Sequence, residues 1–200
     1  MWQHGAALAD EAGLARAWRS AAPFPHLVLD DVVPAAALPA LLELLEAEPV
    51  DRYEADLYAF EATAPEPRTE ALRALRTAFA EALAPPLARI TGKPVRTVDL
   101  RAYAYRVGHY LLPHADHQEG LARQLAFAYY LPSPMPPIGG ELELYACEVE
   151  DGALARIRPA QLIEPRANRL VVFDVSDVSL HQVREVTAGL RISLAGWFYP

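Results

Sequence analysis

The character of the chain changes at Gly92, and this change restricts the folds that it can adopt. Before Gly92, Ala, Leu, Glu and Arg recur with helical spacing, which predicts helices over residues 8–19, 35–48 and 69–91. Residues 24–31 have the β-branched and aromatic character of a short strand. After Gly92, apolar runs separated by Gly, Pro and Asp predict strands at residues 95–106, 123–131, 141–149, 155–158, 169–175, 181–186 and 191–199. Helices followed by short strands are typical of an α+β fold in which helices pack against an antiparallel barrel or jelly roll.

The length and composition of the chain predict one domain. Its 200 residues are 52% hydrophobic, which is enough to bury one core but short for two independent domains. We therefore expect a single domain over residues 1–200, with a helical N-terminal layer at 1–92 and a jelly-roll core at 93–200.

The charge and the cysteine content exclude several classes of protein. A net charge of −8 argues against a nucleic-acid partner, because binding phosphates needs clustered Lys and Arg. The one cysteine, Cys147, has no partner for an intramolecular disulfide, which favours a reducing compartment. Residues 1–18 lack the basic start and apolar centre of a secretory signal, and no stretch has the roughly twenty apolar residues of a membrane span. We expect a cytoplasmic protein with no membrane partner.

Two of the six histidines combine with an aspartate into a candidate metal site. His114 and Asp116 are two residues apart, so in an extended segment both side chains leave the same face. His181, far downstream, would complete a set of two imidazoles and one carboxylate. Such a triad leaves three coordination positions open, as non-haem iron oxygenases require for a chelating cosubstrate and for oxygen. A His-x-Asp pair also arises by chance, so the pair alone does not establish a metal site.

Arg191 begins the apolar stretch RISLAGWFY, ten residues after His181. Both faces of this predicted strand are largely apolar, and an unpaired charge there would be costly, so Arg191 needs an anionic partner. An arginine that forms two parallel hydrogen bonds to a carboxylate can fix a dicarboxylic acid in one orientation. The alternative is a salt bridge within the core, to a residue such as Asp174 or Glu185.

Other residues are expected to have structural roles. Alternation points His117 away from the side on which Asp116 lies, and His26 and His109 are more often packed or solvent-facing than ligands. Gly139 and Gly140 are expected to adopt positive φ in a turn. The proline-rich segment 132–138 could be a mobile lid over the site or a stiff connector, and the sequence does not choose between them.

Several short motifs in the second half occur together in one order and spacing. They are Tyr-x-x-Gly at Tyr105, HAD at His114, YYL at Tyr129, GGEL at Gly139 and HQV at His181, leading to Arg191 and Trp197. This pattern resembles the prolyl-hydroxylase branch of the iron(II)- and 2-oxoglutarate-dependent oxygenases. DLYAF at Asp56, SLHQVREV at Ser179 and LAGWF at Leu194 resemble, more narrowly, the hydroxylases that modify a proline of a ribosomal protein. The resemblance covers residues 23–200, although relatives of that type usually continue into a second, non-catalytic domain.

The resemblance implies a double-stranded β-helix (jelly roll) core with the N-terminal helices packed against one sheet. It implies iron(II) bound by His114, Asp116 and His181, with 2-oxoglutarate and O2 as cosubstrates and ascorbate as a further candidate. The distal carboxylate of 2-oxoglutarate would contact Arg191 and Tyr130. Tyr105 would line the same pocket and Leu112, two residues before the first ligand, would form a wall of it.

The resemblance also implies hydroxylation of the substrate, coupled to oxidation of 2-oxoglutarate to succinate and carbon dioxide. Because Asp116 supplies the carboxylate that halogenating relatives replace with a small residue, it favours hydroxylation over halogenation. Three hypotheses remain open: hydroxylation of a prolyl residue in a protein or peptide, hydroxylation of a free amino acid or small biosynthetic intermediate, and a binding or sensing module without turnover. The complete triad and its arginine disfavour the third.

Overall fold

The computed structural model describes residues 6–200; residues 1–5, which belong to the predicted domain and to the segment excluded as a secretory signal, lie outside this range. The predicted helices are confirmed as α1 (Glu11–Ser20), α2 (Leu38–Glu46) and α3 (Glu70–Thr91), with short 3-10 turns at Ala6–Leu8 and Ala35–Ala37. Among residues 6–200, none of the helices has both the length and the apolar composition needed to cross a membrane.

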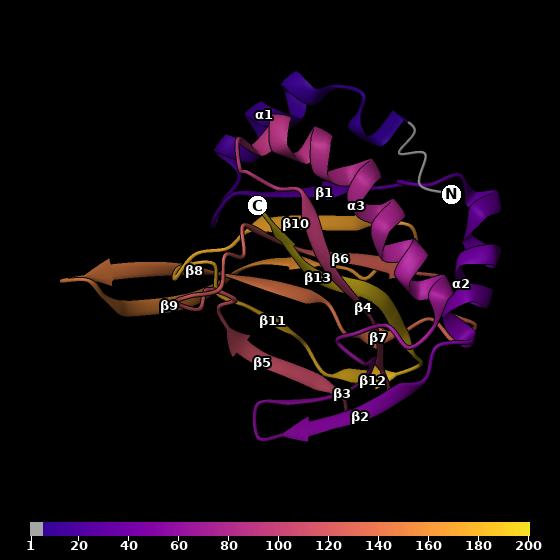
Figure 1. Cartoon of the computed structure of the whole chain (residues 1–200). Helices are drawn as coiled ribbons and strands as arrows, with labels where there is room; N and C mark the ends of the chain where they lie inside the picture. The colour runs from indigo at the N-terminus through magenta and orange to yellow at the C-terminus, as the bar shows by residue number, and fades with distance from the viewer. Residues whose placement is uncertain (1–5) are drawn as a thin grey trace.

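An antiparallel sheet of eleven strands curls around the interior of the molecule (Figure 1). Its order is β1-β10-β6-β13-β4-β3-β5-β11-β8-β9, and β2 pairs with β3. A separate two-stranded ribbon joins β12 to β7. The strands are β1 (His26–Leu29), β2 (Val50–Ala55), β3 (Tyr58–Thr63), β4 (Thr97–Tyr105), β5 (Tyr110–His114), β6 (Leu125–Leu131), β7 (Ile138–Gly139), β8 (Leu142–Glu150), β9 (Ala153–Ile163), β10 (Leu170–Asp174), β11 (His181–Val183), β12 (Val186–Ala188) and β13 (Arg191–Tyr199).

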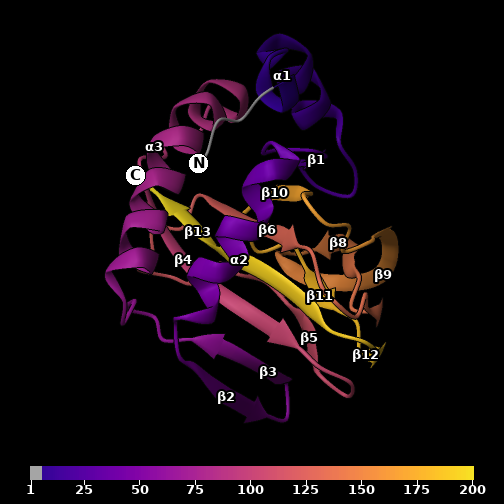
Figure 2. The same ribbon diagram turned by 90° about the vertical axis from the view of Figure 1, so that its right-hand side faces the viewer.

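The strands that the sequence predicts are all present, but the sheet contains more than those. The predicted strand at 181–186 is two strands, β11 and β12, and β5 and the β2–β3 hairpin were not predicted. The region before Gly92 is therefore not a purely helical layer, because β1 pairs with β10 and β3 pairs with both β4 and β5. Figure 2 shows the β2–β3 hairpin at the side of the sheet far from α1.

Helix α3 is delimited by residues suited to its two ends. The Thr69 side chain accepts a hydrogen bond from the Leu72 backbone N–H, as an N-cap residue does. Gly92 ends the helix with a positive φ of 74°, a conformation that glycine adopts without steric cost. These caps determine where α3 begins and ends, and its buried side chains, such as Phe79 and Leu83, pack against the sheet.

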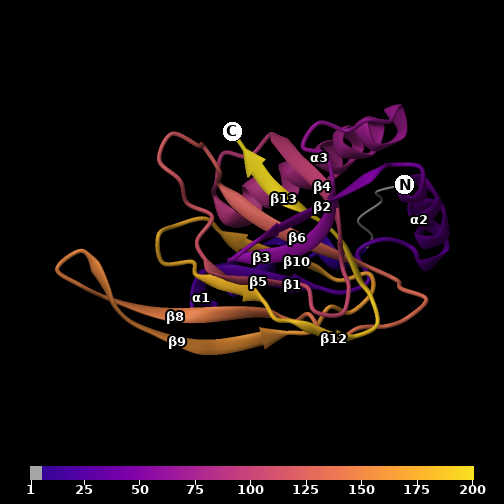
Figure 3. The ribbon, with the colours of Figure 1, turned by 90° about the horizontal axis from the view of Figure 1, so that it is seen from below.

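Each strand under the helices has one face toward α3 and one toward the interior of the curled sheet. In β13, Leu194 and Phe198 belong to the core shared with α1 and α3, while Ala195 and Trp197 pack into the interior cluster. This alternation follows from the two-residue period of a strand. The helices therefore cover the outer face, and the inner face is left for a cavity. Figure 3 shows the long β8–β9 hairpin extending away from this region.

Candidate active site

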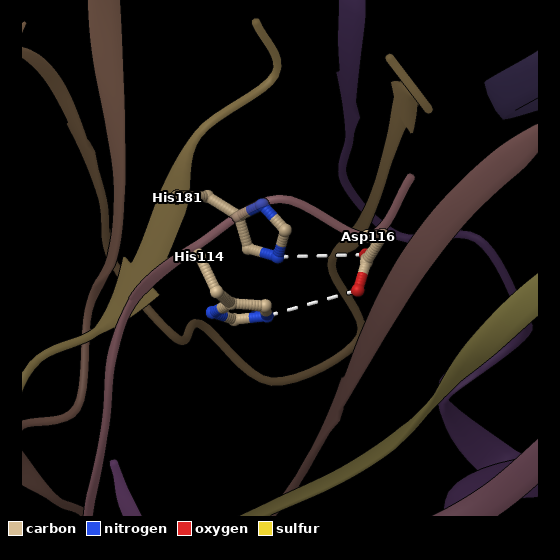
Figure 4. A group of neighbouring side chains, drawn as sticks. All are labelled: His114, Asp116 and His181. Carbon is tan, nitrogen blue, oxygen red and sulfur yellow. Dashed lines mark ion pairs between the residues drawn. The ribbon is translucent and has the colours of Figure 1, made fainter. Parts of the chain in front are cut away.

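His114, Asp116 and His181 converge at one point of the inner face, as Figure 4 shows. One ligand atom from each lies within 4.8 Å of the others. Nε2 of His114 is 3.7 Å from one carboxylate oxygen of Asp116, and Nε2 of His181 is 3.6 Å from the other. These separations are too long for direct hydrogen bonds, but they suit atoms that each approach a shared ion to roughly 2.0–2.2 Å.

The backbone brings the three side chains together. His114 ends β5 and is paired with His181 of β11, so their rings meet at a centroid distance of 4.3 Å. Asp116 follows β5 in a loop, and Arg123 donates a hydrogen bond of 3.0 Å to its backbone carbonyl. The guanidinium of Arg123 also lies 3.6 Å from the centre of the Trp197 ring, which anchors the loop to β13. The residues around Arg123 do not predict this role, because the contact depends on the path of the loop.

Both imidazoles are oriented by backbone carbonyls. Nδ1 of His114 lies 2.9 Å from the Leu112 carbonyl, and Nδ1 of His181 lies 3.0 Å from the Ser179 carbonyl. Because a carbonyl can only accept, each Nδ1 is the donor and the lone pair is on Nε2, which faces Asp116. Burial lowers the pKa of His181 to about 4, with His114 adding to the shift and Asp116 opposing it. The neutral ring that results is the form that binds a metal.

Arg191 is buried at 3% exposure at the start of β13, and its guanidinium faces two aromatic rings. The guanidinium carbon lies 4.7 Å from the centre of the Tyr105 ring and 4.9 Å from that of Tyr130. Nη1 donates to Ser193 at 3.3 Å, while Nε has no hydrogen-bond partner. Within residues 6–200, no carboxylate lies within ion-pair distance of Arg191. Asp174 pairs instead with Lys93, so the alternative of a core salt bridge between Arg191 and Asp174 is wrong.

The two tyrosines beside Arg191 are suited to donate hydrogen bonds. The Tyr130 hydroxyl is buried and has no partner, so it can serve a ligand held by Arg191. Burial raises the pKa of Tyr105, opposed by the charge of Arg191, and its hydroxyl therefore stays protonated. A buried cation with unused donors beside it is an environment that fits one end of a dicarboxylate.

A cavity of about 390 Å³ contains the triad, Arg191 and Tyr105 together. Much of its wall is aromatic, and the β2–β3 hairpin contributes Tyr53, Tyr58 and Phe60 to it. A hollow of about 600 Å³ lies between α3 and the start of β4, but none of the triad lines it, so the chemistry belongs to the smaller cavity. Tyr53, Tyr58 and Phe60 were not identified from the sequence as site residues, because their hairpin was not predicted.

The prediction for Leu112 is wrong. Leu112 is 39% exposed and lines an outer groove with Gln182 and Arg184, whereas Leu111 lines the cavity. The cause is an irregularity in β5: His181 pairs with His114, but Val183 pairs with Leu111, so β5 has one more residue than β11 over this interval. The extra residue reverses the alternation that a regular strand would have.

The remaining sequence predictions concern residues outside the cavity. His117 lies at the surface, 3.7 Å from Asp177, and is not among the residues that line the cavity. Gly139 and Gly140 have φ of 82° and 72°, which confirms the predicted positive φ, although Gly139 belongs to the short strand β7 and not to a turn. The segment 132–138 is held by a hydrogen bond of 2.8 Å from the Leu190 N–H to the Met135 carbonyl. It lines a separate hollow with Arg191, and none of the triad residues lines that hollow. This contact favours the connector over the lid.

The side chains of His114, Asp116 and His181 are suited to bind iron(II). Two imidazoles and one carboxylate on one side of an ion, with open positions opposite, form the arrangement that suits iron(II) in oxygenases. The unpaired guanidinium of Arg191, in the same cavity, fits a cosubstrate with a free carboxylate.

Comparison with known proteins agrees with this geometry. The sequence model of the 2OG-Fe(II) oxygenase superfamily matches residues 100–199. A prolyl 3-hydroxylase of Mus musculus, OGFOD1, is 34% identical over 190 residues; the match covers 88% of this chain but 33% of that protein, so the chain spans about a third of the relative's length.

Solved structures share the fold. A Pseudomonas putida prolyl-4-hydroxylase superposes with a TM-score of 0.67 at 22% identity, covering 93% of this chain and 98% of that one. A prolyl hydroxylase of Trichoplax adhaerens, solved in complex with a hypoxia-inducible-factor peptide fragment, has a TM-score of 0.70 at 15% identity, covering 100% and 93%. These matches confirm the predicted jelly roll, and with the match over residues 100–199 the chain belongs to the 2OG-Fe(II) oxygenase superfamily.

Proposed function

We propose that the chain is a single-domain hydroxylase in which His114, Asp116 and His181 bind iron(II) and Arg191 binds the distal carboxylate of 2-oxoglutarate. One observation carries this proposal: a buried arginine with no carboxylate partner within residues 6–200 lines the same cavity as a complete triad. A purely structural arginine would be paired, because an unpaired buried charge costs several kcal/mol or more.

Bound iron(II), 2-oxoglutarate and O2 supply the oxidising power, and the chain supplies orientation. Arg191 fixes one end of 2-oxoglutarate, with the hydroxyls of Tyr105 and Tyr130 as further donors. The carbonyl partners of His114 and His181 keep both Nε2 lone pairs directed at the metal. The aromatic wall from the β2–β3 hairpin limits the entry of water around the substrate.

The proposed substrate is a prolyl residue of a protein or peptide. The names of the relatives support this: both the 34% identical mouse protein and the Pseudomonas putida and Trichoplax adhaerens structures are prolyl hydroxylases. The second candidate is a free amino acid or small biosynthetic intermediate, which a cavity of about 390 Å³ has room for. A binding module without turnover is disfavoured by the complete triad.

We also propose a cytoplasmic setting and ascorbate as an accessory reductant. The single cysteine, Cys147, is free and needs no oxidising compartment. The net charge of −8 is unsuited to a nucleic-acid partner.

The test is turnover with iron(II), 2-oxoglutarate and a panel of proline-containing peptides, together with free proline and other amino acids. Succinate formation and the mass increase of one oxygen atom on the substrate are measured together. Hydroxylated peptide with no reaction of free amino acids supports the protein substrate, and the reverse supports the small molecule. Tight binding of members of the panel without succinate formation would support the non-catalytic module.

A further inference from the structure

Arg101 lies on the inner face of β4, in the same row of side chains as the 2-oxoglutarate end of the cavity. Register pairs Tyr105 with Arg191, Tyr103 with Ser193 and Arg101 with Ala195. Arg101 is thus four residues along the strand from Tyr105, roughly 13 Å away at roughly 3.3 Å per residue. The short 2-oxoglutarate molecule held by Arg191 does not extend to it. Arg101 also lines the cavity, so it belongs to the substrate side.

The guanidinium of Arg101 is held in place but not neutralised. Its Nε donates to the Thr63 carbonyl at 2.8 Å, and its guanidinium carbon lies 4.8 Å from the centre of the Tyr53 ring and 5.3 Å from that of Tyr103. Nη2 is buried without a hydrogen-bond partner. Across residues 6–200, no carboxylate comes within ion-pair distance of Arg101. This includes Asp99, which lies on the same face of β4.

The two arginines of the cavity are built alike. Arg191 and Arg101 each lie over two tyrosine rings, each have a nitrogen buried without a partner, and each lack a carboxylate neighbour within the described residues. Arg191 is fully buried, whereas Arg101 is partly exposed with Nη2 buried. A guanidinium that is fixed in place and has a buried donor without a partner binds a carboxylate better than it binds a neutral carbonyl, because the charge-assisted hydrogen bond is stronger. The second arginine therefore has the features of a second carboxylate site.

We infer that Arg101 recognises a carboxylate on the substrate and so determines which substrate is hydroxylated. The inference rests on the proposed function and adds the class of substrate to it. Two sources have this chemistry: an acidic side chain that flanks the target proline in a peptide, and the α-carboxylate of a free amino acid. Tyr53, which belongs to the β2–β3 hairpin, then covers the carboxylate site from one side.

The experiment measures binding without turnover, with iron(II) and 2-oxoglutarate present and oxygen excluded. The first set of probes is a series of capped peptides in which Glu moves through the positions flanking one proline, each with a matched Gln peptide. The second is N-acetylproline with N-acetylprolinamide. The third repeats the Glu and Gln peptides with Ala in place of proline. Wild type is compared with Arg101→Gln, which keeps a donor for Thr63, and with Arg101→Lys, which keeps the charge.

We expect wild type to bind one carboxylate probe at least about tenfold more tightly than its neutral partner. Arg101→Gln should remove that preference, so that the ratio of the two dissociation constants falls to about one. Arg101→Lys should retain part of the preference. The matched control is Arg106→Gln, because Arg106 lies immediately after β4 but pairs with Glu61 at the surface. The dissociation constant for 2-oxoglutarate should stay at the wild-type value in all three variants, which shows that the cavity is folded.

The outcomes separate this inference from the proposed function. A preference for Glu peptides identifies the acidic side chain as the source, and a preference for N-acetylproline identifies the α-carboxylate. A third outcome combines two results: the alanine peptides also show a carboxylate preference that depends on Arg101, and the proline peptides are not hydroxylated in air. This outcome supports the inference about Arg101 and overturns prolyl hydroxylation. Hydroxylation of proline probes with equal affinity for acidic and neutral members overturns the inference alone. Absence of any carboxylate preference in all three series also overturns it.

Discussion

The stem of Arg191 lies directly against Gly140. A Cβ at residue 140 would come within 2.9 Å of Cδ of Arg191 and within 2.9 Å of a methyl group of Val186. The position of the arginine thus depends on a residue fifty-one positions earlier that has no side chain. Gly140 also has φ of 72°, so both its backbone and its surroundings favour glycine.

Gly140→Ala should weaken 2-oxoglutarate binding by about tenfold, because the added methyl group displaces Arg191 from its place between the tyrosines. Titration of the variant with 2-oxoglutarate measures this. Gly152→Ala is the matched control: Gly152 has φ of 79° but its Cβ would meet no atom within 4 Å, so it carries the same backbone strain without the contact. Equal losses in both variants would attribute the effect to strain alone.

Arg191→Leu should reduce the affinity for 2-oxoglutarate by at least about tenfold, since a charge-assisted contact in a poorly solvated site contributes roughly 1.5–3 kcal/mol. Iron(II) affinity should be unchanged, because Arg191 is not a proposed ligand. The metal-to-ligand charge-transfer band, followed under anaerobic conditions, reports cosubstrate binding, and a separate titration reports iron. Unaltered 2-oxoglutarate affinity would make Arg191 a structural residue.

Asp116→Ala should abolish hydroxylation and lower the affinity for iron(II) by more than about tenfold, because the triad loses its one anionic ligand. Metal binding is measured by calorimetry and product by mass spectrometry. Asp177→Ala is the control, since Asp177 is 85% exposed and pairs with His117 outside the cavity. Undiminished product from the Asp116 variant would refute the assignment of the ligands.

Glu48 should contribute to stability in a way that depends on pH. Its carboxylate accepts hydrogen bonds from the backbone N–H groups of Arg68 and Thr69 at 2.6 and 2.9 Å, just before α3. Burial alone would raise the pKa of Glu48, but these bonds and the Thr69 hydroxyl hold it below its usual range. Because the folded pKa is lower than the unfolded one, this stabilisation is full above the usual glutamate pKa and disappears as pH falls through the folded value.

Glu48→Gln should therefore lower the free energy of unfolding by about 1–3 kcal/mol at pH 7 and by less at acidic pH. Chemical denaturation at several pH values measures the difference, with Glu46→Gln as the control because Glu46 is exposed. A loss that does not diminish at low pH would mean that the charge of Glu48 is not the stabilising feature.

The parts of the site that the sequence predicted share one property: they depend on local pattern. Strand β13 spans the predicted residues 191–199 because its apolar run is bounded clearly, and α3 has recognisable caps at Thr69 and Gly92. The triad could be proposed because two of its members are two residues apart, at the end of β5 and just after it. In each case a short stretch contains enough information to determine the geometry.

The parts that the sequence did not predict depend on long-range contacts. The β2–β3 hairpin mixes charged, aromatic and alanine residues, and its strand structure depends on pairing with β4 and β5 and on the stacking of Tyr53 on Phe60 at 5.6 Å. Leu111, and not the predicted Leu112, lines the cavity because the register between β5 and β11 is irregular. Neither can be read from one strand considered alone, because the partner strand determines both.

The alternation of β13 also limits how such a chain can change over evolutionary time. One face of this strand supports α3 through Leu194 and Phe198, and the other presents Arg191, Ala195 and Trp197 to the cavity. Inserting or deleting a single residue within β13 would reverse the faces of the residues on one side of the change, placing either the guanidinium beneath a helix or core side chains in the cavity. Replacing Ala195 or Trp197 leaves the register intact. New substrate ranges can therefore arise in this chain by point substitution along β13, whereas a change in its length would alter the core or the cavity.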